Sequence, residues 1–203
     1  MSEWLVREFF ELHGFLVRQA RKYVTPGGRD EEAVDLLVWN PRAETAGEPL
    51  PIELTAEWLG RIPAALVAVK GWHTETFSRA RLEGTPELFR FLEPSVVRRA
   101  TRELGGTAAP LKLLVAPALP RDKVERRASL EWLRARGVDG VIEFRTVVGE
   151  LVRNTEVNRN YEKSDLLQVI RVLKKHGFLQ GPQMELFRPR RGRRRQGGES
   201  QAG

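Results

Sequence analysis

Three charged residues stand in segments that are otherwise apolar. Asp35 lies within the run 34–38, Lys70 ends the run 64–70, and Glu8 falls on the apolar stripe of a predicted helix. A charge removed from water needs a partner of opposite charge or a metal ion, because an isolated buried charge is strongly unfavourable. The chemistry open to these residues is therefore ion pairing or metal binding.

Hydrophobic periodicity predicts the elements that must position these residues. An apolar stripe predicts a first helix over 3–13, ended by Gly14, and short apolar runs between turn signals predict strands. The expected strands cover 15–24, 33–39, 64–70, 111–116 and 140–144, and the expected helices cover 121–136, 146–153 and 164–176, with interrupted helical segments over 77–105 and a short helix near 56–59. This order indicates an α/β fold with a mixed central sheet flanked by helices, in a single domain over 1–180.

Proximity of the three charges depends on how these elements pack. If the second and third strands are neighbours, Asp35 and Lys70 come within reach of each other, and Glu8 faces them only if the first helix covers that face of the sheet. Two structural alternatives stay open. Asp35 and Lys70 could form a buried ion pair, in which desolvation offsets the attraction. Glu8 could sit at the edge of its stripe with the carboxylate in water.

The order helix, three strands, helix, strand, with Asp35 on the second strand and Ala68-Val69-Lys70 on the third, resembles the PD-(D/E)xK, or restriction-endonuclease-like, nuclease superfamily. The resemblance covers roughly residues 1–145. Lys70 matches the lysine of the family motif, and Glu8 matches a glutamate that often joins the site from the first helix. The resemblance implies a metal-dependent nuclease that hydrolyses phosphodiester bonds in nucleic acid, with DNA as the expected substrate.

The chain departs from the family pattern at Ala68, where the second acid is expected. The family uses two carboxylates to hold Mg²⁺ beside the scissile phosphate, and its lysine stabilises charge or helps to activate the attacking water. Mg²⁺ can also be held by one or two carboxylates together with waters and phosphate oxygens. The resemblance therefore implies Asp35, Lys70 and Glu8 as catalytic residues. Asp35, Glu8 and the backbone carbonyl of Val69 would hold Mg²⁺ or Mn²⁺.

Two consequences of the alanine stay open. A displaced carboxylate could come from Glu75, Glu53 or Glu57, which the sequence alone does not place. Alternatively, the protein is a catalytically inactive nuclease fold that binds nucleic acid or a protein partner.

Further residues that could contact nucleic acid lie directly after the third strand and in the last part of the sequence. His73 could bind phosphate and Trp72 could stack on a base, but we favour a plain loop histidine and a tryptophan that packs on the core. From Phe187 onward, six arginines stand against one glutamate, a net charge of +5 that leaves +2 for residues 1–186. This segment, 187–203, is expected to be a disordered tail that binds phosphates or is simply solvated. Its candidate contacts are Arg190, Arg191, Arg193, Arg194 and Arg195.

Composition narrows the remaining classes. With 203 residues and 41 % hydrophobic residues, the chain can bury one core, and without cysteine it has neither disulfides nor thiolate metal sites. We expect no membrane span and a cytoplasmic location, because no apolar run approaches 18 residues and the first residues are charged. The helix 164–176 is apolar on more than one face, which indicates either a deep core position or a homodimer contact.

Overall fold

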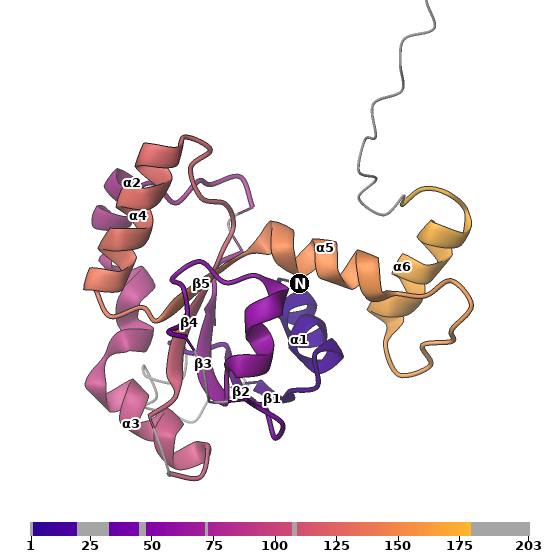
Figure 1. The fold of residues 1–203 in the computed structure, drawn as a ribbon, viewed down its shortest axis with the longest axis horizontal. Helices are drawn as coiled ribbons and strands as arrows, with labels where there is room; N and C mark the ends of the chain where they lie inside the picture. Colours follow the sequence, from indigo (N-terminus) through magenta and orange to yellow (C-terminus); the bar gives the residue numbers. More distant parts are fainter. Residues whose placement is uncertain (1, 20–32, 45–47, 72, 107–108, 180–203) are drawn as a thin grey trace, which may run out of the picture.

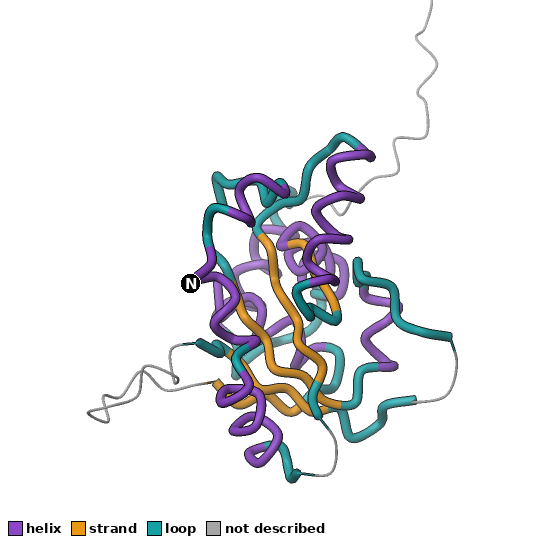
Figure 2. Tube along the Cα trace, turned by 90° about the vertical axis from the view of Figure 1, so that its left-hand side faces the viewer, coloured by secondary structure: helices purple, strands orange, loops and turns teal. Residues whose placement is uncertain are grey.

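The computed structural model describes residues 2–19, 33–44, 48–71, 73–106 and 109–179. Trp72 and the arginines of the predicted tail lie outside the described residues, as does the end of the predicted strand 15–24. Figure 1 shows a central sheet with helices on both sides, and Figure 2 shows the strands running between them. The α/β class with a mixed sheet, predicted from periodicity, is confirmed.

The sheet contains five strands whose spatial order equals their order in the chain. They are β1 (Leu16–Gln19), β2 (Leu36–Trp39), β3 (Ala64–Val69), β4 (Leu111–Ala116) and β5 (Gly140–Glu143). The β1–β2 and β2–β3 pairs are antiparallel, whereas the β3–β4 and β4–β5 pairs are parallel. The carboxyl ends of β3, β4 and β5 therefore meet at one edge of the sheet, which is where residues that follow these strands gather.

Two groups of helices cover the two faces of the sheet. Figure 1 shows α2, α3 and α4 on one side, and α1 and α5 on the other, with α6 at the far end of α5. Their bounds are α1 (Ser2–Leu12), η1 (Ala56–Arg61), α2 (Arg79–Glu83), η2 (Pro86–Leu92), α3 (Pro94–Glu103), α4 (Lys123–Ala135), α5 (Phe144–Asn154) and α6 (Asp165–Lys175), where η marks a 3₁₀ helix. Within the described residues, none of these helices is long and apolar enough to cross a membrane.

The two faces of β3 belong to two separate hydrophobic clusters. Ala65, Val67 and Val69 pack in the cluster under α1, whereas Leu66 and Ala68 pack in the cluster under α2, η2, α3 and α4. This alternation follows from the pleat, which points successive side chains to opposite faces. Strand β3 is consequently buried on both faces, as its continuous apolar sequence predicts.

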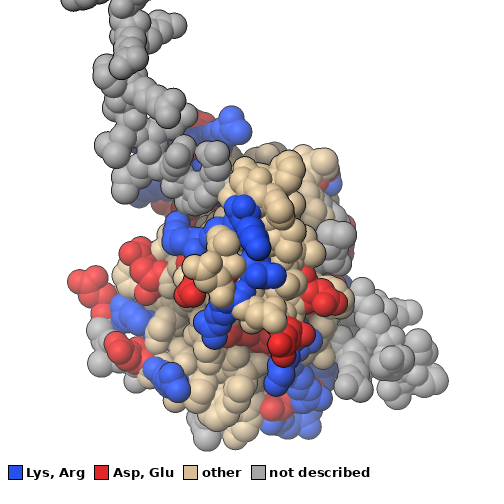
Figure 3. Space-filling model, turned by 90° about the vertical axis from the view of Figure 1, so that its right-hand side faces the viewer, with Lys and Arg blue, Asp and Glu red and all other residues tan. Residues whose placement is uncertain are grey.

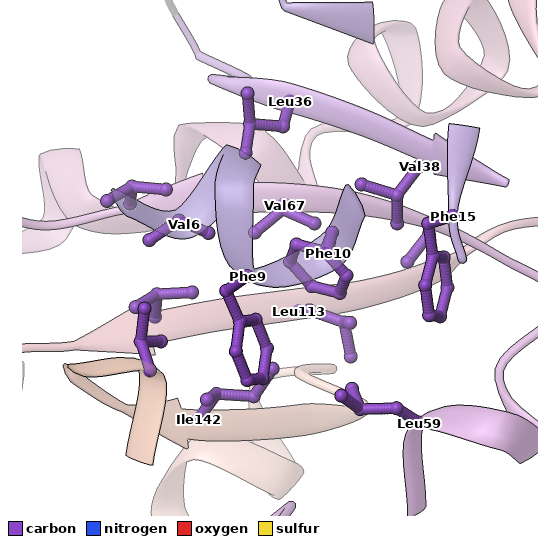
Figure 4. Packing of buried hydrophobic residues seen from close by; sticks show 14 of the residues in the cluster. Val6, Phe9, Phe10, Phe15, Leu36, Val38, Leu59, Val67, Leu113 and Ile142 are labelled. Carbon is purple, nitrogen blue, oxygen red and sulfur yellow. The ribbon is translucent and has the colours of Figure 1, made fainter. Parts of the chain in front are cut away.

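Aromatic side chains fill the cluster under α1. Figure 4 shows Phe9, Phe10 and Phe15 packed over the sheet residues Val67 and Leu113. The rings of Phe9 and Phe10 lie 5.3 Å apart between centroids, and those of Phe10 and Phe15 lie 5.2 Å apart, both edge-to-face. This geometry adds a favourable ring interaction to the burial of apolar area, and it fixes α1 against the sheet.

The start of β5 is packed too closely for any side chain. Residues 52–54 run along the free edge of β5, where the Leu54 N–H donates to the Val141 carbonyl at 2.8 Å. A Cβ built on Gly140 would clash with Leu54 and lie 2.9 Å from Leu113 Cδ2. The glycine therefore permits the close approach of the 52–54 segment to the sheet.

Gly140→Ala is expected to lower the free energy of unfolding by about 1–3 kcal/mol, the usual effect of overpacking a filled core. Urea denaturation measures this change. Gly149→Ala is the matched control, because a Cβ there meets no atom within 4 Å and the residue lies inside α5. The control should be neutral or stabilising by up to about 1 kcal/mol, reflecting helix propensity. Equal effects of the two substitutions would contradict the close packing of Gly140.

Candidate functional site

Asp35 lies directly before β2 and reaches across to β3. Its Oδ2 accepts a hydrogen bond from the Val69 N–H at 2.6 Å, and its own N–H donates to the Val67 carbonyl at 3.1 Å. Leu36 is the register partner of Val67, so two residues of one strand face one residue of the other, as in a β-bulge. The carboxylate thus accepts an N–H at the end of the β2–β3 ladder.

This geometry corrects the sequence interpretation of Asp35. The residue was expected inside a strand over 33–39, but β2 begins at Leu36, and Asp35 is half-buried at its start. The physical reason is the hydrogen bond from the Val69 N–H to the side chain, at the point where regular pairing of β2 with β3 ends. Asp35 therefore has a structural function whatever its chemistry.

Lys70 follows β3 and lies at the same end of the sheet as Asp35. Its N–H donates to the Val115 carbonyl at 3.1 Å, so its backbone continues the parallel pairing of β3 with β4. The residue is half-buried and directly follows Val69, whose N–H binds Asp35. The structure thus brings the two residues of the predicted motif to one strand end.

Position 68, where the resemblance places a second carboxylate, lies in the hydrophobic core. The side chain of Ala68 has no exposed surface and belongs to the cluster that contains Leu66 and Leu114. A carboxylate there would be desolvated unless a cation or hydrogen-bond donors met it. The described surroundings of Ala68 suit an apolar side chain.

Glu8 lies on α1 but away from its buried face. The buried residues of α1 are Val6, Phe9 and Phe10, and Glu8 is half-buried. At about 100° per residue, Glu8 is turned roughly 160° from both Val6 and Phe10. The prediction that Glu8 lies on the apolar face of the first helix is therefore wrong, because the buried face of α1 is centred on Val6, Phe9 and Phe10. Helix α1 also covers the face of Val67 and Val69, opposite to that of Ala68.

The three alternative carboxylates have other partners. Glu75 pairs with Arg81 at 3.3 Å, Glu57 accepts a hydrogen bond from Thr55, and Glu53 pairs with Arg126. Across the described part of the chain, no group of three His, Asp or Glu residues could hold a metal ion. The described residues therefore provide no preformed metal centre of three such ligands.

His73 ties the loop after β3 to two helices. Its Nε2 lies 2.9 Å from Ser2 Oγ at the start of α1, and its ring centroid lies 4.4 Å from that of Phe144 at the start of α5. Gly71 lies equally close to α1, because a Cβ built on it would be 2.5 Å from Ser2 Oγ. These contacts favour a positioning role for His73 over a loose loop histidine.

A charged network that the sequence did not reveal lies at the carboxyl end of β5. Arg126 of α4 binds both Glu53 and Glu143, and Glu143 Oε1 also accepts the Leu119 N–H at 2.8 Å. Burial opposes ionisation of Glu143, but the hydrogen bonds from Arg126 and Leu119 outweigh it and lower its pKa. The hydrogen bonds that Arg126 donates to Glu53 and to Glu143 raise its pKa, although partial burial opposes them. The sequence carried no signal, because the partners are 73 and 17 residues apart.

We expect Asp35→Ala to lower the free energy of unfolding by about 1–3 kcal/mol, because the Val69 N–H loses a charged acceptor. Asp35→Asn keeps an oxygen acceptor and should lose less than half of that amount. Urea denaturation at neutral pH distinguishes the two. If Asp35→Ala is as stable as the wild type, the role of the carboxylate at the end of the ladder is refuted.

Removing the charge of Glu143 should lower the free energy of unfolding at neutral pH, and much less so in acid. Because the folded-state pKa of Glu143 lies below its ordinary value of about 4.3, its stabilisation is complete above that pH and is lost as the pH falls through the folded-state pKa. Glu143→Gln should therefore cost about 1–2 kcal/mol at pH 7 and much less at pH 3. Urea denaturation at both pH values tests this, with the exposed Glu131→Gln expected to change little.

Comparison with known proteins adds no assignment to this geometry. No family model, no curated protein and no solved structure matches the chain. The site must therefore be interpreted from its own residues, chiefly Asp35, Ala68 and Lys70.

Proposed function

We propose that this chain is a nucleic-acid-binding protein with a restriction-endonuclease-like fold and an incomplete metal centre. The arrangement of elements supports the fold half of the proposal. Helix α1 is followed by three antiparallel strands, a helical crossover and a parallel fourth strand, which is the order that the resemblance implies. Asp35 directly before β2 and Lys70 directly after β3 lie at the same end of the sheet, next to the strands to which the resemblance assigns them.

One observation carries the incomplete centre. Ala68 is fully buried in an apolar cluster at the position of the second acid. The acid that remains, Asp35, accepts a backbone N–H of β3, and Glu8 lies off the buried face of α1. This leaves one carboxylate to hold a metal ion, whereas Lys70 remains a cation that can bind a phosphate group, so binding is favoured over metal-assisted hydrolysis.

Charge supports nucleic acid as the partner. The chain carries a net charge of +7, most of it in the segment after Phe187. Figure 3 shows Lys and Arg side chains in a band across one face of the molecule, between acidic groups on either side. In the sequence, the segment 153–175, from the end of α5 through α6, carries six basic residues against three acidic ones, the basic ones being Arg153, Arg159, Lys163, Arg171, Lys174 and Lys175. Such charge attracts polyanions without reading their sequence.

An active nuclease is the second candidate, and the proximity of Asp35 and Lys70 to the Val69 backbone favours it. A substrate phosphate could supply the oxygens that Ala68 does not, since Mg²⁺ accepts waters and phosphate oxygens as ligands. We derive no catalytic step, because the described residues contain no group of three His, Asp or Glu side chains that could hold the metal ion.

The binding proposal is tested with the full chain, labelled DNA and RNA of single- and double-stranded form, and fluorescence anisotropy in EDTA. We expect binding that weakens steeply with salt. Replacing Arg190, Arg191, Arg193, Arg194 and Arg195 by Gln should reduce the slope of log affinity against log salt by up to about 4.5 for duplex DNA, since each phosphate contact contributes roughly 0.9.

A control variant with the same change in net charge distinguishes binding by the arginines of the tail from the effect of net charge alone. It replaces five exposed arginines elsewhere by Gln, namely Arg7, Arg79, Arg98, Arg102 and Arg127. This control should retain most of the wild-type slope. Absence of binding at low salt would refute the proposed function, whereas cleavage with Mn²⁺ that Lys70→Ala abolishes would establish the nuclease instead.

A further inference from the structure

Helix α6 is held firmly by the domain on one side. Leu167 and Ile170 are buried in the cluster under α1, and Lys174 Nζ donates to the carbonyls of Val152 and Thr155 at 2.8 and 2.6 Å. Ser164 Oγ accepts the Leu167 N–H and caps the first turn. The helix is therefore a rigid element with a fixed outer face.

The last turn of α6 is closed as firmly as the first. Gly177 has a φ of 76°, its N–H donates to the Lys174 carbonyl, and the Phe178 N–H donates to the Leu173 carbonyl at 2.9 Å. These two bonds form a Schellman motif, which satisfies carbonyls that the helix end would leave unpaired. The outer face thus keeps its full length without fraying.

The outer face of α6 carries apolar residues at the spacing of a coiled-coil seam. Asp165, Val169, Val172 and His176 follow one another by four, three and four residues, and all four are exposed. Val169 is 54 % exposed and Val172 is 42 % exposed. Two valines at such spacing on a rigid helix form a stripe that another helix could cover.

This stripe is complementary to itself in the antiparallel sense. A twofold axis through the middle of the stripe sets Val169 against Val172 of a second copy, and the same axis sets Asp165 against His176. A patch that matches its own rotated image is what an isologous dimer interface requires.

The charges at the two ends of α6 favour an antiparallel pair of helices and indicate that the partner is a second copy of this chain. The first residue of α6, Asp165, is acidic, whereas its last residues, Lys174 and Lys175, are basic. A parallel pair of helices would bring like charges together at both ends, but the antiparallel pair brings Asp165 beside Lys175 and His176 of the other copy. We propose that the outer face of α6 binds the same face of a second copy of this chain.

The size of the face predicts a weak dimer. Eleven residues give a helix of about 16 Å. Such a contact is smaller than the roughly 1,600 Å² of a standard interface. Phe178, 78 % exposed directly after α6, adds apolar surface at each end. The dimer should therefore form at high protein concentration and dissociate on dilution.

Sedimentation velocity of the full chain over a wide concentration range tests the interface. We expect a concentration-dependent dimer for the wild type and at least a tenfold higher dissociation constant for Val169→Asp. Val124→Asp is the matched control, since Val124 is 77 % exposed on α4, and it should leave the dissociation constant unchanged. A monomer at every concentration, or a dimer that Val169→Asp leaves intact, would overturn the proposal.

The absence of native cysteine permits a direct test of orientation. Mixed Asp165→Cys and His176→Cys proteins should form a disulfide between the two variants under mild oxidation. Asp165→Cys alone should not crosslink, because its two copies lie about 16 Å apart along an antiparallel pair. Efficient crosslinking of Asp165→Cys alone would indicate a parallel pair and refute the twofold arrangement.

Discussion

Strand β3 pairs with a strand on each edge and is covered by helices on each face, so a charged side chain within it would lose its water entirely. Desolvation of this kind confines charge to the ends of the strand. Lys70 occupies one end, and Asp35 meets the same end from β2. The end of β3 therefore determines where charged side chains can lie on this strand. Ala68, two residues before Lys70, belongs to the core.

The edge of the sheet shows how the fold accommodates its other charges. Arg126 balances Glu53 and Glu143 beside β5, while His73 links the loop after β3 to Ser2 and Phe144. Each group is held by contacts between elements that are distant in the chain. Such contacts fix the positions of these side chains relative to the carboxyl ends of the parallel strands.

Much of the fold could be predicted from the sequence, because alternation and helical spacing are local signals. The strands over 64–70 and 111–116 and the helix over 121–136 match β3, β4 and α4 within two residues at each end. The site was less predictable. The bond from Val69 to Asp35 and the contact of His73 with Ser2 join residues 34 and 71 positions apart, and no local pattern reports them. The phase of α1 was also ambiguous, since Leu5 and Leu12 are apolar but only half-buried, which drew Glu8 onto the expected stripe.

The spatial order of the five strands in the sheet is also the order in which they are synthesised, so each described strand after β1 pairs with the one made before it. An emerging chain can therefore extend the sheet by one edge at a time, without inserting a late strand between early ones. The packing around α1 is completed later than the pairing of the strands. Helix α1 is made before the described strands and packs on β1, β2 and β3, yet α5, which lies beside α1 with His13 close to Glu150, is completed only at Asn154. The part of the apolar face of α1 that α5 covers therefore stays open to solvent until the chain has been made as far as Asn154, so the packing of α1 is completed after the strands have paired.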